Sequence, residues 1–123
     1  MPKDMKTALI VDDEEALREI ISEVLALLEI NSIIAEDGFQ AVEAVREHKD
    51  KIDLFLIDLY MPNMSGEETF KKLDELAPNR PVIFMSGYDR DSSTMPKVLN
   101  KNQKFLKKPF GIVDLKNLIE SMR

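Results

Sequence analysis

Polar residues that could do chemistry directly follow the most apolar runs of this sequence. Asp12 and Asp13 follow the run ALIV, Asp58 follows LFLI, and Ser86 follows VIFM. A lysine, Lys108, stands two residues after the shorter run FL. If these runs are parallel strands, their carboxyl ends share one edge of a sheet, where ligands of such folds bind. The sequence therefore predicts that these five side chains lie close together.

Three carboxylates at one edge repel each other unless a positive charge lies among them. Mg²⁺ is the favoured cation because it binds oxygen ligands and keeps several waters, and Mn²⁺ should also fit. Zinc would usually recruit histidine or cysteine, but the chain has no cysteine and a single histidine, His48. His48 ends a predicted helix, and stabilisation of the helix C-terminus is enough to explain it. Neither a histidine-based metal site nor a serine-histidine triad can be built here.

An aspartate beside Mg²⁺, a lysine and a hydroxyl form a set suited to phosphoryl transfer. We expect Asp58 to attack phosphorus, and the metal and Lys108 to neutralise charge on the transferring oxygens. Ser86 would donate a hydrogen bond to one of these oxygens. The product would be an aspartyl phosphate.

Each of these residues also has a simpler interpretation when it is considered alone. The helix that follows could merely be capped by Asp13, and its positive N-terminal end stabilised by the negative charges of Asp13, Glu14 and Glu15. The two glutamates need no further role. Asp58 and Ser86 could be turn residues, and a lone lysine usually lies on the surface. Their joint placement is what favours a shared site.

Two periodicities alternate along the chain and predict the elements that would position these residues. Short continuous apolar runs indicate strands buried on both faces at 8–11, 54–57 and 82–85, with weaker candidates at 32–35 and 105–106. Apolar spacings of three and four predict helices at 17–28, 38–48, 66–76 and 112–122. A further short helix is expected to begin near Ser92 to Thr94, since Pro96 is tolerated only in a first turn.

The order strand then helix, repeated five times, implies parallel strands, because each helix returns the chain across a face of the sheet. We expect a doubly wound α/β sandwich. Asp53 lies five residues before Asp58 in one strand, roughly 17 Å away at about 3.3 Å per residue, and so belongs to the opposite end of the sheet. No linker, repeat or low-complexity tract suggests a second domain.

Charge and hydropathy exclude several classes of function. A formal charge of −6 and the absence of a basic stripe argue against direct nucleic-acid binding by this domain. The apolar segments are far shorter than the roughly 20 residues of a membrane helix, and an aspartate pair interrupts the first apolar run before a signal peptide could form. We expect a cytoplasmic protein without membrane insertion.

Four motifs, in this order and at these spacings, resemble the response regulator receiver domain of two-component signalling. They are LIVDDEEAL, LFLIDLYMPNMSGEE, PVIFMSGYD and KFLKKPF, and the resemblance runs from about Lys6 to Met122. It implies a single CheY-like receiver domain over 1–123. It also implies the flavodoxin-like (βα)5 fold, with a five-stranded parallel sheet in the strand order 2-1-3-4-5.

The resemblance also implies roles for the acidic residues. Asp12 and Asp13 would hold Mg²⁺, Asp13 directly and Asp12 partly through water. Asp58 would be the phosphorylated residue and a metal ligand, with the backbone carbonyl of Tyr60 as a further ligand. Ser86 and the lysine before the proline of KKP would contact the phosphoryl group.

In this family the charge change is coupled to a face made of the fourth helix, the fifth strand and the fifth helix. Ser86 would move toward the phosphoryl group, and an aromatic residue on the fifth strand would turn inward. Phe105 stands at that position, where tyrosine is more usual; alternatively it is an ordinary core residue. Tyr60 and Tyr88 flank the expected path of attacking water, where they would prolong the lifetime of the phosphoryl group or simply be exposed.

The leading hypothesis is a Mg²⁺-dependent phosphoacceptor switch that a histidine kinase or histidine phosphotransfer protein phosphorylates at Asp58. Its output would be binding of a partner, or formation of a homodimer, through the face described above, and it would catalyse only its own phosphorylation and dephosphorylation. One alternative is an aspartate-nucleophile phosphohydrolase similar to haloacid dehalogenases, although Tyr60 stands where those enzymes carry a second aspartate. Another is a degenerate receiver that only binds partners.

Overall fold

The computed structural model describes residues 5–87 and 102–123. Strands and helices follow one another in the order β1 (Thr7–Val11), α1 (Glu15–Leu27), β2 (Asn31–Ala35), α2 (Gly38–His48), β3 (Leu54–Asp58), α3 (Gly66–Leu76), β4 (Val82–Gly87), β5 (Gln103–Lys108) and α4 (Ile112–Met122). The helix expected near Ser92 to Thr94 lies outside the described residues, as does Tyr88. The other predicted strands and helices are confirmed, and α2, α3 and α4 have the predicted bounds.

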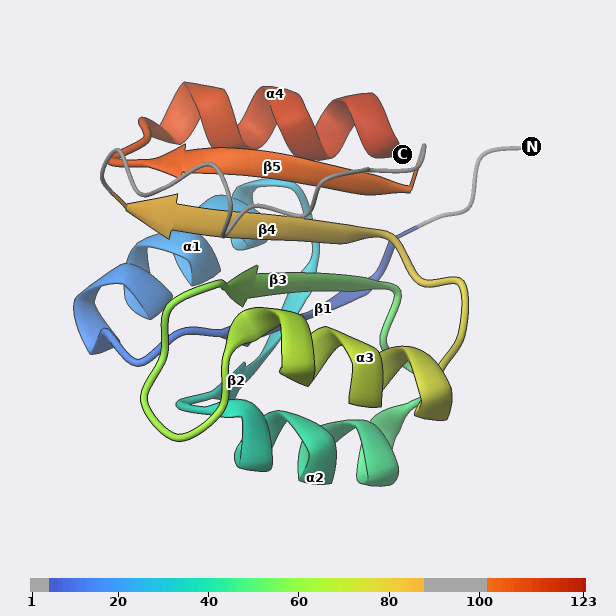
Figure 1. Ribbon diagram of the computed structural model, residues 1–123. Helices are drawn as coiled ribbons and strands as arrows, with labels where there is room; N and C mark the ends of the chain where they lie inside the picture. The colour runs from blue at the N-terminus through green and yellow to red at the C-terminus, as the bar shows by residue number, and fades with distance from the viewer. Residues whose placement is uncertain (1–4, 88–101) are drawn as a thin grey trace.

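All five strands are parallel and form one sheet in the order β2-β1-β3-β4-β5, as predicted (Figure 1). Because β1 lies between β2 and β3, the strand order reverses there. The carboxyl ends of β1 and β3 are therefore adjacent at the point where open α/β sheets bind ligands.

Helices cover both faces of the sheet (Figure 1). One core cluster lies between the sheet and the pair α1 and α4, and includes Ile10, Leu25 and Ile119. The other lies between the sheet and the pair α2 and α3, and includes Leu9 and Leu73. Successive residues of a strand point to opposite faces, so both faces of the central strands must be apolar. The continuous apolar runs in the sequence follow from this double burial.

Side chains fix the starts of two helices on the second face. The hydroxyl of Ser65 accepts a hydrogen bond of 3.1 Å from the main-chain nitrogen of Glu68 and so caps the N-terminus of α3. The carboxylate of Asp37 caps α2 in the same way, with a bond of 2.8 Å from the nitrogen of Gln40. Among residues 5–87 and 102–123, no helix combines the length and apolar character needed to cross a membrane.

Candidate metal centre

The three predicted carboxylates meet at the carboxyl ends of β1 and β3. Asp12 is fully buried, Asp58 is 4% exposed and Asp13 is exposed. One carboxylate oxygen from each lies within 4.8 Å of the others. Two buried carboxylates with an exposed third form an acidic site that is open to solvent on one side.

Asp12 is held by hydrogen bonds from three neighbouring elements. Its main-chain nitrogen donates to the oxygen of Ala35 in β2 at 3.2 Å, and its main-chain oxygen accepts from Arg18 at 2.8 Å. Its carboxylate accepts from the nitrogen of Glu14 at 2.9 Å and from Nζ of Lys108 at 2.8 Å. The end of β1 is therefore fixed to β2, α1 and β5 together.

Lys108 places its ammonium group among the carboxylates. Nζ lies 2.8 Å from Oδ2 of Asp12, 3.4 Å from Oδ2 of Asp58 and 3.5 Å from Oε1 of Glu14. Burial disfavours the ammonium form, but the hydrogen bond to Asp12 and the surrounding negative charges outweigh it and raise the pKa of Lys108. The side chain therefore carries a positive charge into the site.

The surroundings of Asp58 change its acidity. Burial raises its pKa to about 6, and the neighbouring charge of Asp12 acts in the same direction. The ammonium of Lys108 and a 3.3 Å hydrogen bond from the nitrogen of Tyr60 oppose this shift. Near neutral pH the carboxyl group is mostly ionised, as a nucleophile must be.

The donor set fits Mg²⁺ on chemical grounds. Among the residues that the structure describes, only the ammonium of Lys108 forms ion pairs with this cluster of three carboxylates, so negative charge remains in a partly buried space. All the ligand atoms that the cluster offers are carboxylate oxygens, which suit Mg²⁺ or Mn²⁺ and not the softer metals.

A close approach at Gly66 fixes the main chain that carries Asp58. A methyl group at Gly66 would lie 2.4 Å from the main-chain oxygen of Asp58 and 2.6 Å from Cα of Leu59. The nitrogen of Gly66 also donates to the oxygen of Leu59 at 3.0 Å. Only glycine allows the first residue of α3 to pack this tightly against the end of β3.

The other predicted residues that the structure describes are Ser86, Tyr60 and Phe105. Ser86 is 3% exposed at the end of β4, and its hydroxyl donates to the oxygen of Gly87 at 3.4 Å. Tyr60 and Phe105 are half-buried and pack against the core cluster under α2 and α3. Their roles as metal ligand, access control and switch stay predictions, as does the role of Tyr88.

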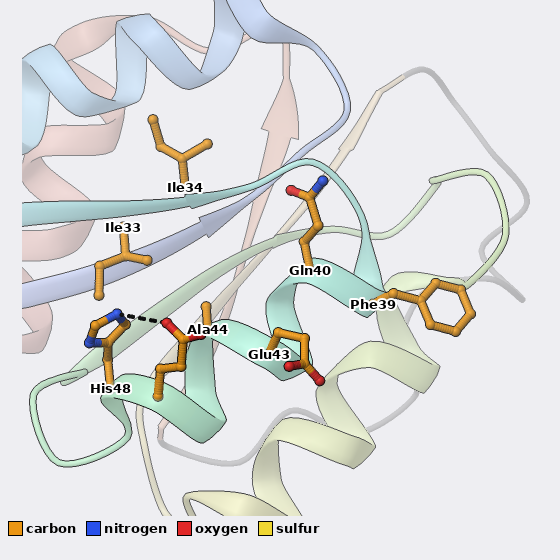
Figure 2. A pocket seen from close by; sticks show the side chains of 8 residues that line it. Ile33, Ile34, Phe39, Gln40, Glu43, Ala44 and His48 are labelled. Atoms are coloured by element: carbon orange, nitrogen blue, oxygen red, sulfur yellow. Dashed lines mark ion pairs between the residues drawn. The ribbon is translucent and has the colours of Figure 1, made fainter.

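A cavity of about 820 Å³ opens beside the cluster. Asp13, Asp58 and Lys108 are among its lining residues, together with the apolar side chains of Leu17 and Phe110. A second, apolar hollow of about 430 Å³ lies between β2 and α2, and none of the predicted metal or phosphoryl-binding residues that the structure describes lines it (Figure 2). Space for a phosphorylated group is therefore adjacent to Asp58.

Two other titratable residues, Asp53 and His48, lie away from the acidic cluster, as predicted for Asp53. Asp53 precedes β3 at the opposite end of the sheet, where its carboxylate accepts hydrogen bonds from the nitrogens of Lys6 and Thr7 at 2.8 and 3.2 Å. His48 ends α2, and its Nε2 lies 3.5 Å from the carboxylate of Glu47.

Known proteins share both the sequence pattern and the fold. The family of the response regulator receiver domain matches residues 8–120. A crystal structure of the receiver domain from the hybrid histidine kinase CckA covers 94% of this chain and 97% of that chain, with 28% identity and a TM-score of 0.80. A CheY-like receiver domain from Methylobacillus flagellatus covers 98% of this chain and all of its own, with 27% identity and a TM-score of 0.77.

Relatives of this chain differ widely in length. The autoinducer 1 sensor kinase/phosphatase LuxN of Vibrio campbellii is 32% identical over 115 residues, which are 92% of this chain and 13% of LuxN. The response regulator receiver protein CpdR of Brucella abortus is 28% identical over 118 residues, which are 96% of this chain and 97% of CpdR. The chain thus spans a small part of some relatives and nearly all of another. With its fold and the match over residues 8–120, this chain belongs to the response regulator receiver domain family.

Proposed function

We propose that this chain is a Mg²⁺-dependent phosphoacceptor switch that a histidine kinase or histidine phosphotransfer protein phosphorylates at Asp58. One observation carries the proposal: the ammonium of Lys108 lies 2.8 Å from Asp12 and 3.4 Å from Asp58, beside the open acidic cluster. A nucleophilic carboxylate, a metal-binding pair and a fixed cation are the parts that phosphoryl transfer requires.

The transfer step follows from these parts. An oxygen of Asp58 bonds to phosphorus as the bond between phosphorus and the imidazole nitrogen of the donor breaks, and the electron pair stays with the imidazole. Lys108 neutralises charge on the transferring oxygens, and Ser86 donates a hydrogen bond to one of them. Asp12, Asp13, Asp58 and the carbonyl of Tyr60 would hold Mg²⁺, which would supply further positive charge. Hydrolysis reverses the state when water attacks phosphorus and the Asp58 carboxylate leaves.

The output of the switch is binding. Phosphorylation draws Ser86 toward the new group, and Phe105 on β5 repacks by shape alone because it has no hydroxyl. The face that includes β5 and α4 then binds a partner or a second copy. Tyr60 and Tyr88 limit the access of water and so set the lifetime of the phosphoryl group. The domain acts in the cytoplasm, contacts no nucleic acid directly and turns over no other substrate.

Acetyl phosphate is expected to transfer one phosphoryl group per chain in the presence of Mg²⁺ and none in the presence of a chelator. Intact-protein mass spectrometry measures this directly, and a generic aryl phosphate ester in parallel reports any turnover. Sustained release of phosphate from the ester would indicate a phosphohydrolase in place of a switch. Failure of labelling with Mg²⁺ would indicate a domain that only binds partners.

A further inference from the structure

Arg18 is a buried arginine that contacts the metal centre from α1. The residue is 7% exposed, and its Nη1 donates a buried 2.8 Å hydrogen bond to the main-chain oxygen of Asp12. Its Nη2 lies 3.7 Å from the carboxylate of Glu36, whose side chain is 61% exposed. An ion pair of this length to an exposed partner contributes little. The bond to Asp12 is therefore the main interaction that compensates the burial of the guanidinium.

This bond bears on Asp13, the exposed member of the acidic cluster. The oxygen of Asp12 and the nitrogen of Asp13 belong to one planar peptide unit, so a fixed carbonyl fixes the plane from which the Asp13 side chain departs. The carboxylate of Asp12 is held independently by Lys108 and the nitrogen of Glu14. Within residues 5–87 and 102–123, no hydrogen bond holds the carboxylate of Asp13. Its direction therefore depends on its main chain.

Gln40 holds Glu36, the acidic residue beside the guanidinium. The main-chain nitrogen of Glu36 donates to Oε1 of Gln40 at 2.9 Å, and Nε2 of Gln40 donates to the Glu36 carboxylate at 3.0 Å. Figure 2 shows Gln40 in the first turn of α2, with its amide directed at the connection from β2. Glu36 is thus held on the side where Arg18 lies.

We propose that Arg18 is a positioning residue of the metal centre, which orients the Asp12–Asp13 peptide so that the Asp13 carboxylate faces the metal. The inference rests on the proposed Mg²⁺ function. The direction of the change in Mg²⁺ affinity distinguishes this positioning role from the simple effect of the charge of Arg18. Loss of a positive charge near three carboxylates would by itself strengthen the binding of a cation, whereas loss of the positioning bond weakens it.

The test compares Mg²⁺ titrations of the wild type and Arg18→Met by calorimetry, with ¹H–¹⁵N spectra of the metal-free proteins. We expect Arg18→Met to bind Mg²⁺ roughly tenfold more weakly, as is typical when a group that orients a ligand is removed. We also expect its Asp13 amide resonance to shift in the absence of metal, because that nitrogen shares the peptide of the released carbonyl. Arg18→Gln, which is too short to reach the carbonyl, carries the same test if Arg18→Met does not fold.

Arg80→Met is the matched control. Arg80 also donates hydrogen bonds to main-chain oxygens, those of Ile52 at 2.9 Å and Lys49 at 3.0 Å. These bonds lie near the end of the sheet opposite the metal centre. Its replacement removes the same charge and the same kind of bond, so the affinity for Mg²⁺ should be unchanged at a temperature where the variant is folded.

The outcomes separate this inference from the proposed function. Equal or tighter binding in Arg18→Met, with an unmoved Asp13 amide, would overturn the positioning role, as would an equal loss of affinity in Arg80→Met. If the wild type itself failed to bind Mg²⁺, the proposed function would fail, and the metal-free Asp13 resonance would still report whether Arg18 orients the peptide.

Discussion

Replacing Asp58 with asparagine is expected to stabilise the metal-free protein by about 2–3 kcal/mol at pH 7 and to change little near pH 4. Burial raises the pKa of Asp58 from 3.8 to about 6, so the folded protein binds this proton more tightly than the unfolded chain does. The stability that the protonated form contributes is fully present below pH 3.8 and is lost as the pH rises through about 6. Asparagine has nearly the same shape as aspartate but carries no charge. Urea unfolding in a chelator at several pH values measures the difference.

Two comparisons sharpen this result. The exposed Asp50→Asn removes the same charge at the surface and should change the free energy of unfolding only slightly. Millimolar Mg²⁺ should raise the stability of the wild type through linkage, and raise it less in Asp58→Asn, because one of the three carboxylates is gone. If the two proteins responded equally to pH, the carboxyl group would not be desolvated as described.

Replacing Lys108 with methionine is expected to slow phosphoryl transfer from acetyl phosphate by roughly 10²–10³-fold. It should also destabilise the metal-free protein by about 2–3 kcal/mol, because Asp12 and Asp58 would stay buried without their shared cation. The affinity for Mg²⁺ should rise, since the ammonium no longer competes for the same oxygens. Labelling rates at saturating Mg²⁺ isolate the effect on transfer from the effect on metal binding.

Lys104→Met is the control for this substitution. Lys104 lies in the same strand, four residues before Lys108 and therefore about 13 Å away at about 3.3 Å per residue. The Lys104→Met variant should be labelled at the wild-type rate. A labelling rate in Lys108→Met equal to that of Lys104→Met would contradict the role of Lys108 in transfer.

The fold can be predicted because its two periodicities differ so clearly. The runs in β1, β3 and β4 are continuous, since these strands are covered on both faces, and short continuous apolar runs are typical of such strands. The edge strand β5 is harder to predict: it extends over Gln103–Lys108 and contains three lysines, because an edge strand is only half-covered. Only its two central residues, Phe105 and Leu106, form an apolar run that indicates a strand.

The predicted acidic cluster and its lysine are confirmed as neighbours, since parallel strands bring their carboxyl ends together whatever their separation in the sequence. Sequence reasoning misses Glu14 and Arg18 as parts of the site. Glu14 is of a residue type that is common at the start of a helix. No neighbouring residue in the sequence indicates that its carboxylate lies 3.5 Å from Nζ of Lys108. Arg18 does have a signal, because it lies in phase with Ile21 and Leu25 on the buried face of α1.

The same helix shows why spacing alone does not assign its faces. Ile20 fits the apolar pattern as well as Ile21 does, yet it is 44% exposed, whereas the charged Arg18 is buried. The acidic cluster at the end of β1 explains this difference, because the guanidinium of Arg18 donates to the main-chain oxygen of Asp12 where the core would otherwise hold an apolar side chain. A charged residue in phase with a buried stripe is therefore evidence of a nearby polar site.

The most direct test of the central claim maps the modified residue. The protein is incubated with acetyl phosphate and Mg²⁺ and then treated with borohydride, which reduces an aspartyl phosphate to homoserine, and peptide mass spectrometry locates the product. We expect homoserine at position 58 alone, and none when Mg²⁺ is replaced by a chelator. Homoserine at position 12 or 13, or its absence from position 58 in protein that has gained a phosphoryl group, would contradict the assignment of Asp58 as the phosphoacceptor.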